Sequence, residues 1–152
     1  MNHIDQAGKL LLVAAKDMKA MELMNSQPDA SVIEWFSHQT SATFCTTAIT
    51  KSEISLGIAL LPAGKRRDAL TDAAEKMFQE DFFGNCLPFD DSCANLYASI
   101  VANRRRSGLS ITTEDAQIAA IAMRHQLPLA TRNTKDFLQI AGLTLYNPWS
   151  KP

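Results

Sequence analysis

The sequence predicts an α/β domain in which helices cover both faces of a largely parallel β-sheet. Short apolar segments of strand length alternate with longer segments whose apolar residues recur at helical spacing. Strands separated by helices in this way require crossover connections, which place successive strands parallel in one sheet. A chain of 152 residues is long enough for one such core and too short for two. We therefore expect a single domain over residues 1–152, with residues 1–9 as a loose tail.

In the first third of the chain, a strand is predicted at residues 10–15, a continuous apolar run that suits burial on both faces. A helix is predicted over residues 16–25, and Asp29 is placed to cap a second helix. The Thr- and Phe-rich residues 42–49 form the second predicted strand. Thr50 is expected to open the helix that follows.

In the middle of the chain, residues 65–80 form the next predicted helix. Its expected inward face consists of Leu70, Ala73, Met77 and Phe78. A short strand is expected at residues 86–89, followed by a long helix with Asp91 as its N-cap. Gly108 suits the end of that helix, since glycine readily adopts the left-handed conformation found just past helix ends.

The last third contains one more predicted helix and two predicted strands. The helix starts after Thr112 and has an apolar stripe on one side. The strands are expected at residues 127–130 and 143–146. The chain thus alternates between strands and helices to its end, as a parallel α/β sheet requires.

Composition excludes several classes of protein. A net charge of −1 is not that of a protein that binds nucleic acid through its overall charge. The chain has no apolar run long enough to cross a bilayer and no signal peptide at its start, so we expect a cytoplasmic protein with no membrane partner. Cys45, Cys86 and Cys93 are odd in number and lack CxxC spacing, so we interpret them as small core residues.

Three acidic residues are expected at one edge of the sheet. Glu53, Asp115 and Asp136 either follow predicted strands or open predicted helices, and sites in open parallel sheets lie beyond the carboxyl ends of the strands. Carboxylates without histidine or thiol partners suit Mg²⁺ or Mn²⁺ better than zinc. Such ions activate water and neutralise charge on a phosphodiester. The pattern therefore favours metal-dependent hydrolysis.

Each carboxylate also has a purely structural interpretation. Thr50-x-x-Glu53 fits a capping box, and Thr112-x-x-Asp115 is a looser version of it. Asp136 fits a turn before a packed aromatic residue. Capping explains each residue separately, but it does not explain why several should lie at one edge.

Basic residues form two triplets, Lys65–Arg67 and Arg104–Arg106, with Arg124 and Arg132 as single residues. One interpretation is that the triplets are solvated helix ends, where the helix dipole favours positive charge near the C-terminus. The alternative is a rim that contacts phosphates. The sequence leaves both open.

Five segments, in a fixed order, resemble a known family. They are SATFCTTAITKSEISLGIALLPAGKRR, LPFDDSCANLYASI, ITTEDAQIAAIA, LATRNTKDF and YNPW. They resemble the PIN-domain ribonucleases of the VapC type, and within that type the FitB-like branch, over residues 26–149. The resemblance implies a dimeric α/β/α domain with a Mg²⁺ or Mn²⁺ site that hydrolyses RNA. It also implies an antitoxin partner, and the protein would contact DNA only through that antitoxin. Arg132 would contact an RNA phosphate.

The resemblance also implies roles for individual residues. Glu53 and Asp115 match acidic residues of the family and would be catalytic metal ligands, with Asp136 as a further catalytic ligand. Asn133 occupies the position that is Asp or Asn in the TRN/TRD motif. Thr131 would contribute a hydroxyl that supports the ligands.

The first motif of the family, a strand ending in Asp-Thr-Asn-x-x-Ser-Glu-Leu, is altered here. With Glu22 and Leu23 as anchors, the metal-binding Asp falls on Lys16, and Asp17 is one residue out of register. A unit charge about 4 Å away is worth about 4 kcal/mol at an effective dielectric constant of about 20, so a lysine directed into the site opposes metal binding. Either a one-residue slip brings Asp17 to the metal, or the protein is a weakened or inactive PIN domain that keeps its fold and partner surface.

Overall fold

The computed structural model describes residues 9–12, 43–82 and 84–147. Within these ranges, the first strand is β1 (Lys9–Leu12), which begins one residue inside the predicted tail. The predicted helices over residues 16–25 and after Asp29 lie outside the described residues, and so do Lys16 and Asp17.

The sheet is parallel throughout its described strands. Besides β1 it contains β2 (Thr43–Thr47), β3 (Cys86–Leu87), β4 (Leu129–Ala130) and β5 (Leu145–Tyr146). Their order is β3-β2-β1-β4-β5. From β1 the chain winds outward to β3 and then returns to the other side of β1, so the winding direction changes between β1 and β4. This switch point is where open α/β sheets bind their ligands, beyond the carboxyl ends of the strands.

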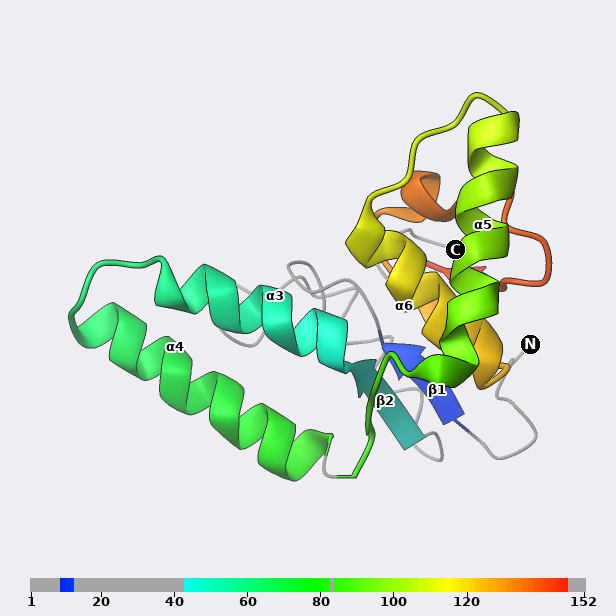
Figure 1. Cartoon of the computed structure of the whole chain (residues 1–152). Coiled ribbons are helices and arrows are strands. Elements are labelled where there is room, and N and C mark those ends of the chain that lie inside the picture. The colour runs from blue at the N-terminus through cyan, green and yellow to red at the C-terminus, as the bar shows by residue number, and fades with distance from the viewer. Residues whose placement is uncertain (1–8, 13–42, 83, 148–152) are drawn as a thin grey trace.

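The described helices form two groups (Figure 1). One group is a hairpin of α3 (Ala48–Ala59) and α4 (Lys65–Lys76), continued by the π-helical segment η1 (Met77–Asp81). The other contains the 3-10 turn η2 (Asp91–Cys93), α5 (Ala94–Arg106), α6 (Thr113–Arg124) and the 3-10 turn η3 (Thr134–Phe137). Helices α5 and α6 pack on each other beside the sheet, whereas the α3–α4 hairpin projects away from it.

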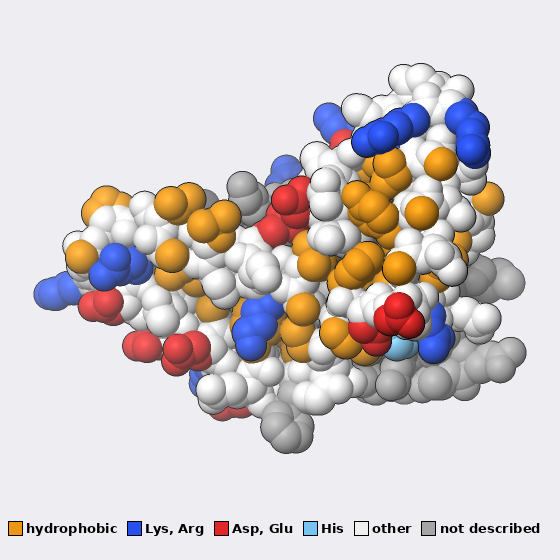
Figure 2. Space-filling view, viewed as in Figure 1, with side chains coloured by type: hydrophobic (Ala, Val, Ile, Leu, Met, Phe, Trp, Pro, Cys, Tyr) orange, Lys and Arg blue, Asp and Glu red, His pale blue; other side chains and the backbone are white. Residues whose placement is uncertain are grey.

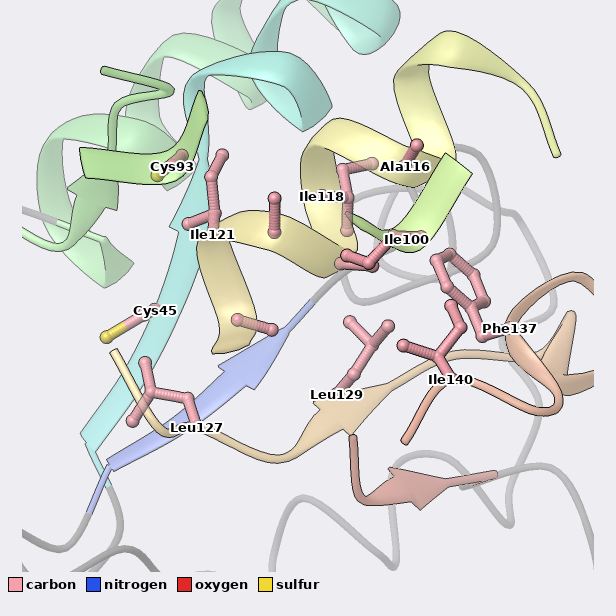
Figure 3. Packing of buried hydrophobic residues seen from close by; sticks show 13 residues of the cluster. Cys45, Cys93, Ile100, Ala116, Ile118, Ile121, Leu127, Leu129, Phe137 and Ile140 are labelled. Carbon is pink, nitrogen blue, oxygen red and sulfur yellow. The ribbon is translucent and has the colours of Figure 1, made fainter. Parts of the chain in front are cut away.

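Side chains from the two faces of the sheet enter two different cores. Successive residues of a strand point to opposite faces. Accordingly, Cys45 and Leu129 belong to the core under α5 and α6 (Figure 3), whereas Phe44 and Ala130 belong to the core lined by α3 and α4. Helices therefore contribute to the packing on both faces, which confirms the predicted α/β sandwich with a parallel sheet.

The N-terminus of α3 differs from the prediction. The helix begins at Ala48 and not at Thr50, and its N-cap is Thr47, whose Oγ1 accepts a hydrogen bond from the Thr50 N–H at 2.9 Å. The predicted capping box of Thr50 and Glu53 is therefore wrong. The physical reason is that strand and helix join without a loop, since Thr47 has the extended backbone of a strand end and of an N-cap at once.

Two smaller predictions are also corrected. The carboxylate of Asp90, and not of Asp91, accepts the capping hydrogen bond from the Ser92 N–H at 3.0 Å. In α4, Ala73 is exposed and Ala74 is buried. The inward face therefore follows the helical spacing i, i+4, i+7, i+8. Counted from Leu70, this spacing selects Ala74, Met77 and Phe78 and leaves out Ala73.

Other local predictions are confirmed. Gly108 has φ +72° and ends α5, and the Leu109 N–H donates to the carbonyl of Arg104 at 2.9 Å. Cys45 and Cys93 are buried, Cys86 is partly buried, and no disulfide links any of the three. Among the described helices, we find none that combines the length and the apolar character needed to span a bilayer.

Candidate active site

Two segments that carry acidic residues meet near the switch point. Helix α6 precedes β4 and returns the chain to it, so the N-terminus of α6 lies at the carboxyl edge of the sheet. The 3-10 turn η3 follows β4 at the same edge and contacts α6. In Figure 2, acidic side chains are visible at the junction between the α3–α4 hairpin and the part that contains α5 and α6.

Asp115 lies in the first turn of α6, and its carboxylate is half-buried. The Asp115 N–H donates to Thr112 Oγ1 at 3.1 Å, so the predicted cap is confirmed. Burial raises the pKa of Asp115, and the negative charges of Asp136 and Glu114 raise it further. The hydroxyl of Thr112 donates to the carboxylate, and together with the charge of Arg104 it acts in the opposite direction. Thr112 thus caps the backbone N–H of Asp115, while burial and neighbouring negative charges disfavour the ionised form of the Asp115 carboxylate.

Asp136 lies in η3, where its side chain is partly buried. Its N–H donates to the carbonyl of Asn133 at 3.0 Å, and the Asn133 N–H donates to Thr131 Oγ1 at 3.1 Å. Thr131 is fully buried directly after β4. A buried hydroxyl therefore folds this segment back toward α6. Phe137, the residue after Asp136, packs into the core. Asp136 therefore lies in a turn before a packed aromatic residue, as one interpretation expected, and its charge also acts on Asp115.

The structure does not join Glu53 to this pair. Glu53 lies in α3, a helix that contacts α6, and it is partly exposed. Over residues 9–12, 43–82 and 84–147, no group of three or more His, Cys, Asp or Glu side chains is close enough to hold a metal ion. The described chain therefore brings together Asp115 and Asp136, and Asp17 lies outside it.

The chemistry of the pair fits a hard divalent cation. Its donors are carboxylate oxygens, which Mg²⁺ and Mn²⁺ prefer, and neither histidine nor thiol takes part. The charge of Asp136 acts unfavourably on ionised Asp115. A cation between two such carboxylates would relieve that repulsion. Asp115 and Asp136 are therefore the described residues that fit a metal.

The arginine triplet of α5 is not uniformly solvated. Arg105 and Arg106 are exposed as expected for a helix end, but Arg104 is buried, with 5% of its surface exposed. Sequence reasoning missed this because it treated the three residues as one charged group. The available signal was helical spacing, since Arg104 lies four residues after buried Ile100 on the same face of the helix.

The single arginine after β4 lies beside the site in sequence. Arg132 is exposed and stands between buried Thr131 and Asn133, which forms part of the η3 turn. An exposed guanidinium at this position is accessible to a ligand at the carboxyl edge of the sheet.

Fold and site together define an α/β protein with an acidic site beyond the carboxyl ends of its parallel strands. The chain belongs to the PIN-domain family, whose model matches residues 20–143. The resemblance to the VapC type and its FitB-like branch is confirmed by relatives that cover 84% of this chain and 91% of their own length. They are the plasmid stability protein StbB of Pseudomonas syringae pv. tomato (41% identical), the VapC ribonuclease Y4jK of Sinorhizobium fredii (38%) and the toxin FitB of Neisseria gonorrhoeae (36%).

Solved structures agree with this assignment. The crystal structure of FitAcB from Neisseria gonorrhoeae matches with a TM-score of 0.80 and 35% identity, covering 92% of this chain and 98% of that one. FitAB bound to an IR36 DNA fragment matches with a TM-score of 0.82 and 33% identity, covering 94% and 97%.

Proposed function

We propose that this protein is the toxin of a type II toxin–antitoxin pair and that it hydrolyses RNA phosphodiester bonds with Mg²⁺ or Mn²⁺. The observation that carries the proposal is the pairing of Asp115 with Asp136 at the carboxyl edge of the sheet. Relatives named as a ribonuclease and as a toxin support it. The proposal includes a single domain over residues 1–152 and a cytoplasmic location.

In this proposal, Asp115 and Asp136 hold the cation and are catalytic, with Glu53 and Asp17 as further ligands. When bound, the ion acts as a Lewis acid that favours deprotonation of water and neutralises charge on the phosphodiester. Asp115 is held in place by its cap. Asp136 is held by the η3 turn, which depends on the hydrogen bond between Asn133 and Thr131.

The RNA would approach from the exposed side of the same edge. Arg132 contacts an RNA phosphate and orients the backbone over the two carboxylates. Water then attacks phosphorus and displaces the 3′-oxygen of the preceding nucleotide, which takes up a proton. The products carry 5′-phosphate and 3′-hydroxyl ends.

The proposed partners are a cognate antitoxin and a second copy of this chain, with DNA reached only through the antitoxin. A solved relative supports the route to DNA, since FitAB, 33% identical to this chain, was determined bound to a DNA fragment. On this chain, Leu56 of α3 and Leu60 at its C-cap are both exposed, one helical turn apart. Exposed apolar residues of this kind suit a protein contact.

The test of the activity is RNA cleavage by Asp115→Asn in the presence of Mn²⁺. Loss of a metal ligand should lower cleavage by at least about a hundredfold, since even residues that merely support ligands are worth about ten- to a hundredfold in affinity or activity. Glu114→Gln removes a neighbouring charge from the same helix turn and should keep cleavage within a few-fold of wild type. Undiminished cleavage by Asp115→Asn contradicts the assignment.

A second candidate function is a weakened or inactive PIN domain that binds the antitoxin and regulates the operator. The observation that favours it is Lys16, which stands where the family has a metal-binding Asp. Isothermal titration with Mn²⁺ separates the two functions. Binding that disappears in Asp17→Ala supports the enzyme with a slipped ligand, whereas no binding to the wild-type protein supports the regulatory module.

A further inference from the structure

Arg104 is a buried cation at the end of α5. Its neighbours Arg105 and Arg106 are exposed, as is usual for charged residues in the last turn of a helix. Burying a charge costs free energy unless hydrogen bonds and nearby opposite charges compensate it. A methionine or leucine would fill the same space without that cost. The presence of arginine therefore calls for a role beyond packing.

The hydrogen bonds of Arg104 connect two segments that are distant in sequence. Nη1 donates to the carbonyl oxygen of Leu138 at 2.5 Å, and Nη2 donates to the carbonyl oxygen of Ser110 at 2.6 Å. Ser110 lies two residues before Thr112, the N-cap of α6, and Leu138 directly follows η3. One planar guanidinium thus bridges the loop that leads to Asp115 and the turn that contains Asp136.

The charge of Arg104 also faces the acidic site. The guanidinium acts electrostatically on Asp115, in the direction that favours the ionised carboxylate. Both hydrogen-bond acceptors are neutral carbonyls, and Nε has no partner among the described residues. Within the described part of the chain, no ion pair neutralises the positive charge, which can therefore offset part of the repulsion that acts on Asp115.

We propose that Arg104 is a positioning residue for the acidic site. It holds the loop at Ser110 and the end of η3 at a fixed separation, which sets the distance between Asp115 and Asp136. Its charge offsets part of the repulsion that acts on the Asp115 carboxylate before a cation binds. This inference rests on the proposed function, because the geometry it fixes is that of the metal-binding pair.

The test compares Arg104→Met and Arg104→Lys with two kinds of control. Arg105→Met removes an adjacent exposed arginine. Ile100→Ala truncates a buried residue on the same face of α5, in the core cluster that also contains Phe137, and leaves both Arg104 hydrogen bonds in place. For each variant, Mn²⁺ affinity is measured by isothermal titration, and backbone mobility is measured by amide hydrogen exchange with mass spectrometry in metal-free buffer.

Arg104→Met is expected to weaken Mn²⁺ binding by about ten- to a hundredfold, the range found for residues that orient metal ligands. It should also speed exchange in residues 109–115 and 131–138, with α3 unchanged. Arg104→Lys keeps the charge but loses the bidentate fork, so its affinity should fall between those of Arg104→Met and wild type. Both controls should bind Mn²⁺ within about threefold of wild type, even if Ile100→Ala is less stable.

Mn²⁺ affinity and exchange equal to wild type in Arg104→Met overturn the inference. If Arg104→Met does not fold, Arg104→Lys decides, because wild-type values in that variant show that the fork is dispensable. An Ile100→Ala variant that loses as much affinity as Arg104→Met also overturns it, since general destabilisation would then suffice. A wild-type protein that binds no Mn²⁺ refutes the proposed function instead, and exchange in the two segments then decides whether the clamp exists.

Discussion

Replacing Asp115 with Asn should make the metal-free protein more stable than a matched variant that loses a neighbouring charge, while removing its proposed activity. The carboxylate is half-buried next to the negative charges of Asp136 and Glu114, and both burial and these charges raise its pKa. An amide of the same shape removes the charge and still accepts a hydrogen bond from the Thr112 hydroxyl. The matched control is Glu114→Gln, which removes an exposed charge from the same first turn of α6.

The magnitude follows from two opposing effects. Removing the repulsion from partly solvated Asp115 should gain about 0.5–1 kcal/mol, the size typical of charge interactions screened by water. Losing a negative charge at a helix N-terminus costs about 0.3–1 kcal/mol, and Glu114→Gln pays the same cost. The free energy of unfolding of Asp115→Asn should therefore exceed that of Glu114→Gln by about 0.5–1 kcal/mol. For a domain of this size, that is about 1–4 °C in melting temperature.

The pH dependence of this difference has a definite sign. Because the folded-state pKa of Asp115 lies above the ordinary value of 3.8, the native protein binds more protons than the unfolded chain between those two values. Stability contributed by this residue therefore falls as pH rises through that window. The stability difference between Asp115→Asn and Glu114→Gln should be largest at neutral pH and should shrink as the pH is lowered toward 3.8.

The assay is differential scanning calorimetry with EDTA at pH 7.5, repeated at lower pH and then with Mn²⁺. At a Mn²⁺ concentration of about 100 times Kd, the wild-type protein should gain about 2.7 kcal/mol from binding, and Asp115→Asn should gain little, so their order reverses. The reasoning is refuted if Asp115→Asn is less stable than Glu114→Gln in EDTA at pH 7.5. A gap between the two variants that widens on acidification would contradict it as well.

Two further predictions concern the segments that support the site. Thr47→Val should lower the free energy of unfolding, measured by urea titration, by about 1–3 kcal/mol, because it removes the α3 cap and leaves the buried Thr50 N–H unpaired. The control Thr113→Val changes an exposed threonine and should stay within about 0.5 kcal/mol of wild type. Phe137→Ala should lower the free energy of unfolding by about 3–5 kcal/mol, because Phe137 is only 2% exposed. The neighbouring Leu138 is 51% exposed, so Leu138→Ala should lower it by less than about 1 kcal/mol. Equal losses in the two variants would show that η3 is not anchored through Phe137.

Hydrophobic periodicity was enough to predict the architecture, because burial on two faces and crossover connections leave few alternatives to a parallel sheet. Element boundaries were less well predicted. The segment around Thr47 and Thr50 offers two threonines able to cap α3, and the choice between them depends on where β2 stops pairing with β1 and β3. The same applies to Asp90 and Asp91, since adjacent aspartates have equal intrinsic ability to cap.

For the candidate site, the sequence predicted that Asp115 and Asp136 lie at one edge of the sheet, because the switch-point rule places residues after strands and before helices there. It did not identify Arg104. The three consecutive arginines look alike in the sequence. Only their position on the helix distinguishes them, since Arg104 lies on the same face as buried Ile100 and the other two do not. The two backbone carbonyls that accept hydrogen bonds from Arg104 lie 6 and 34 positions away, so no local motif reveals these contacts.

Capping and metal binding, which the sequence offers as alternatives for Asp115, are compatible in the structure. The N–H of Asp115 donates to Thr112 Oγ1 while the Thr112 hydroxyl engages its carboxylate, so the cap also fixes the direction of the charged group. The helix N-terminus carries partial positive charge, which stabilises an ionised carboxylate there. Together with the charge of Arg104, it partly offsets the repulsion from Asp136. A capped helix start is therefore a physical means of keeping two carboxylates close together until a cation arrives.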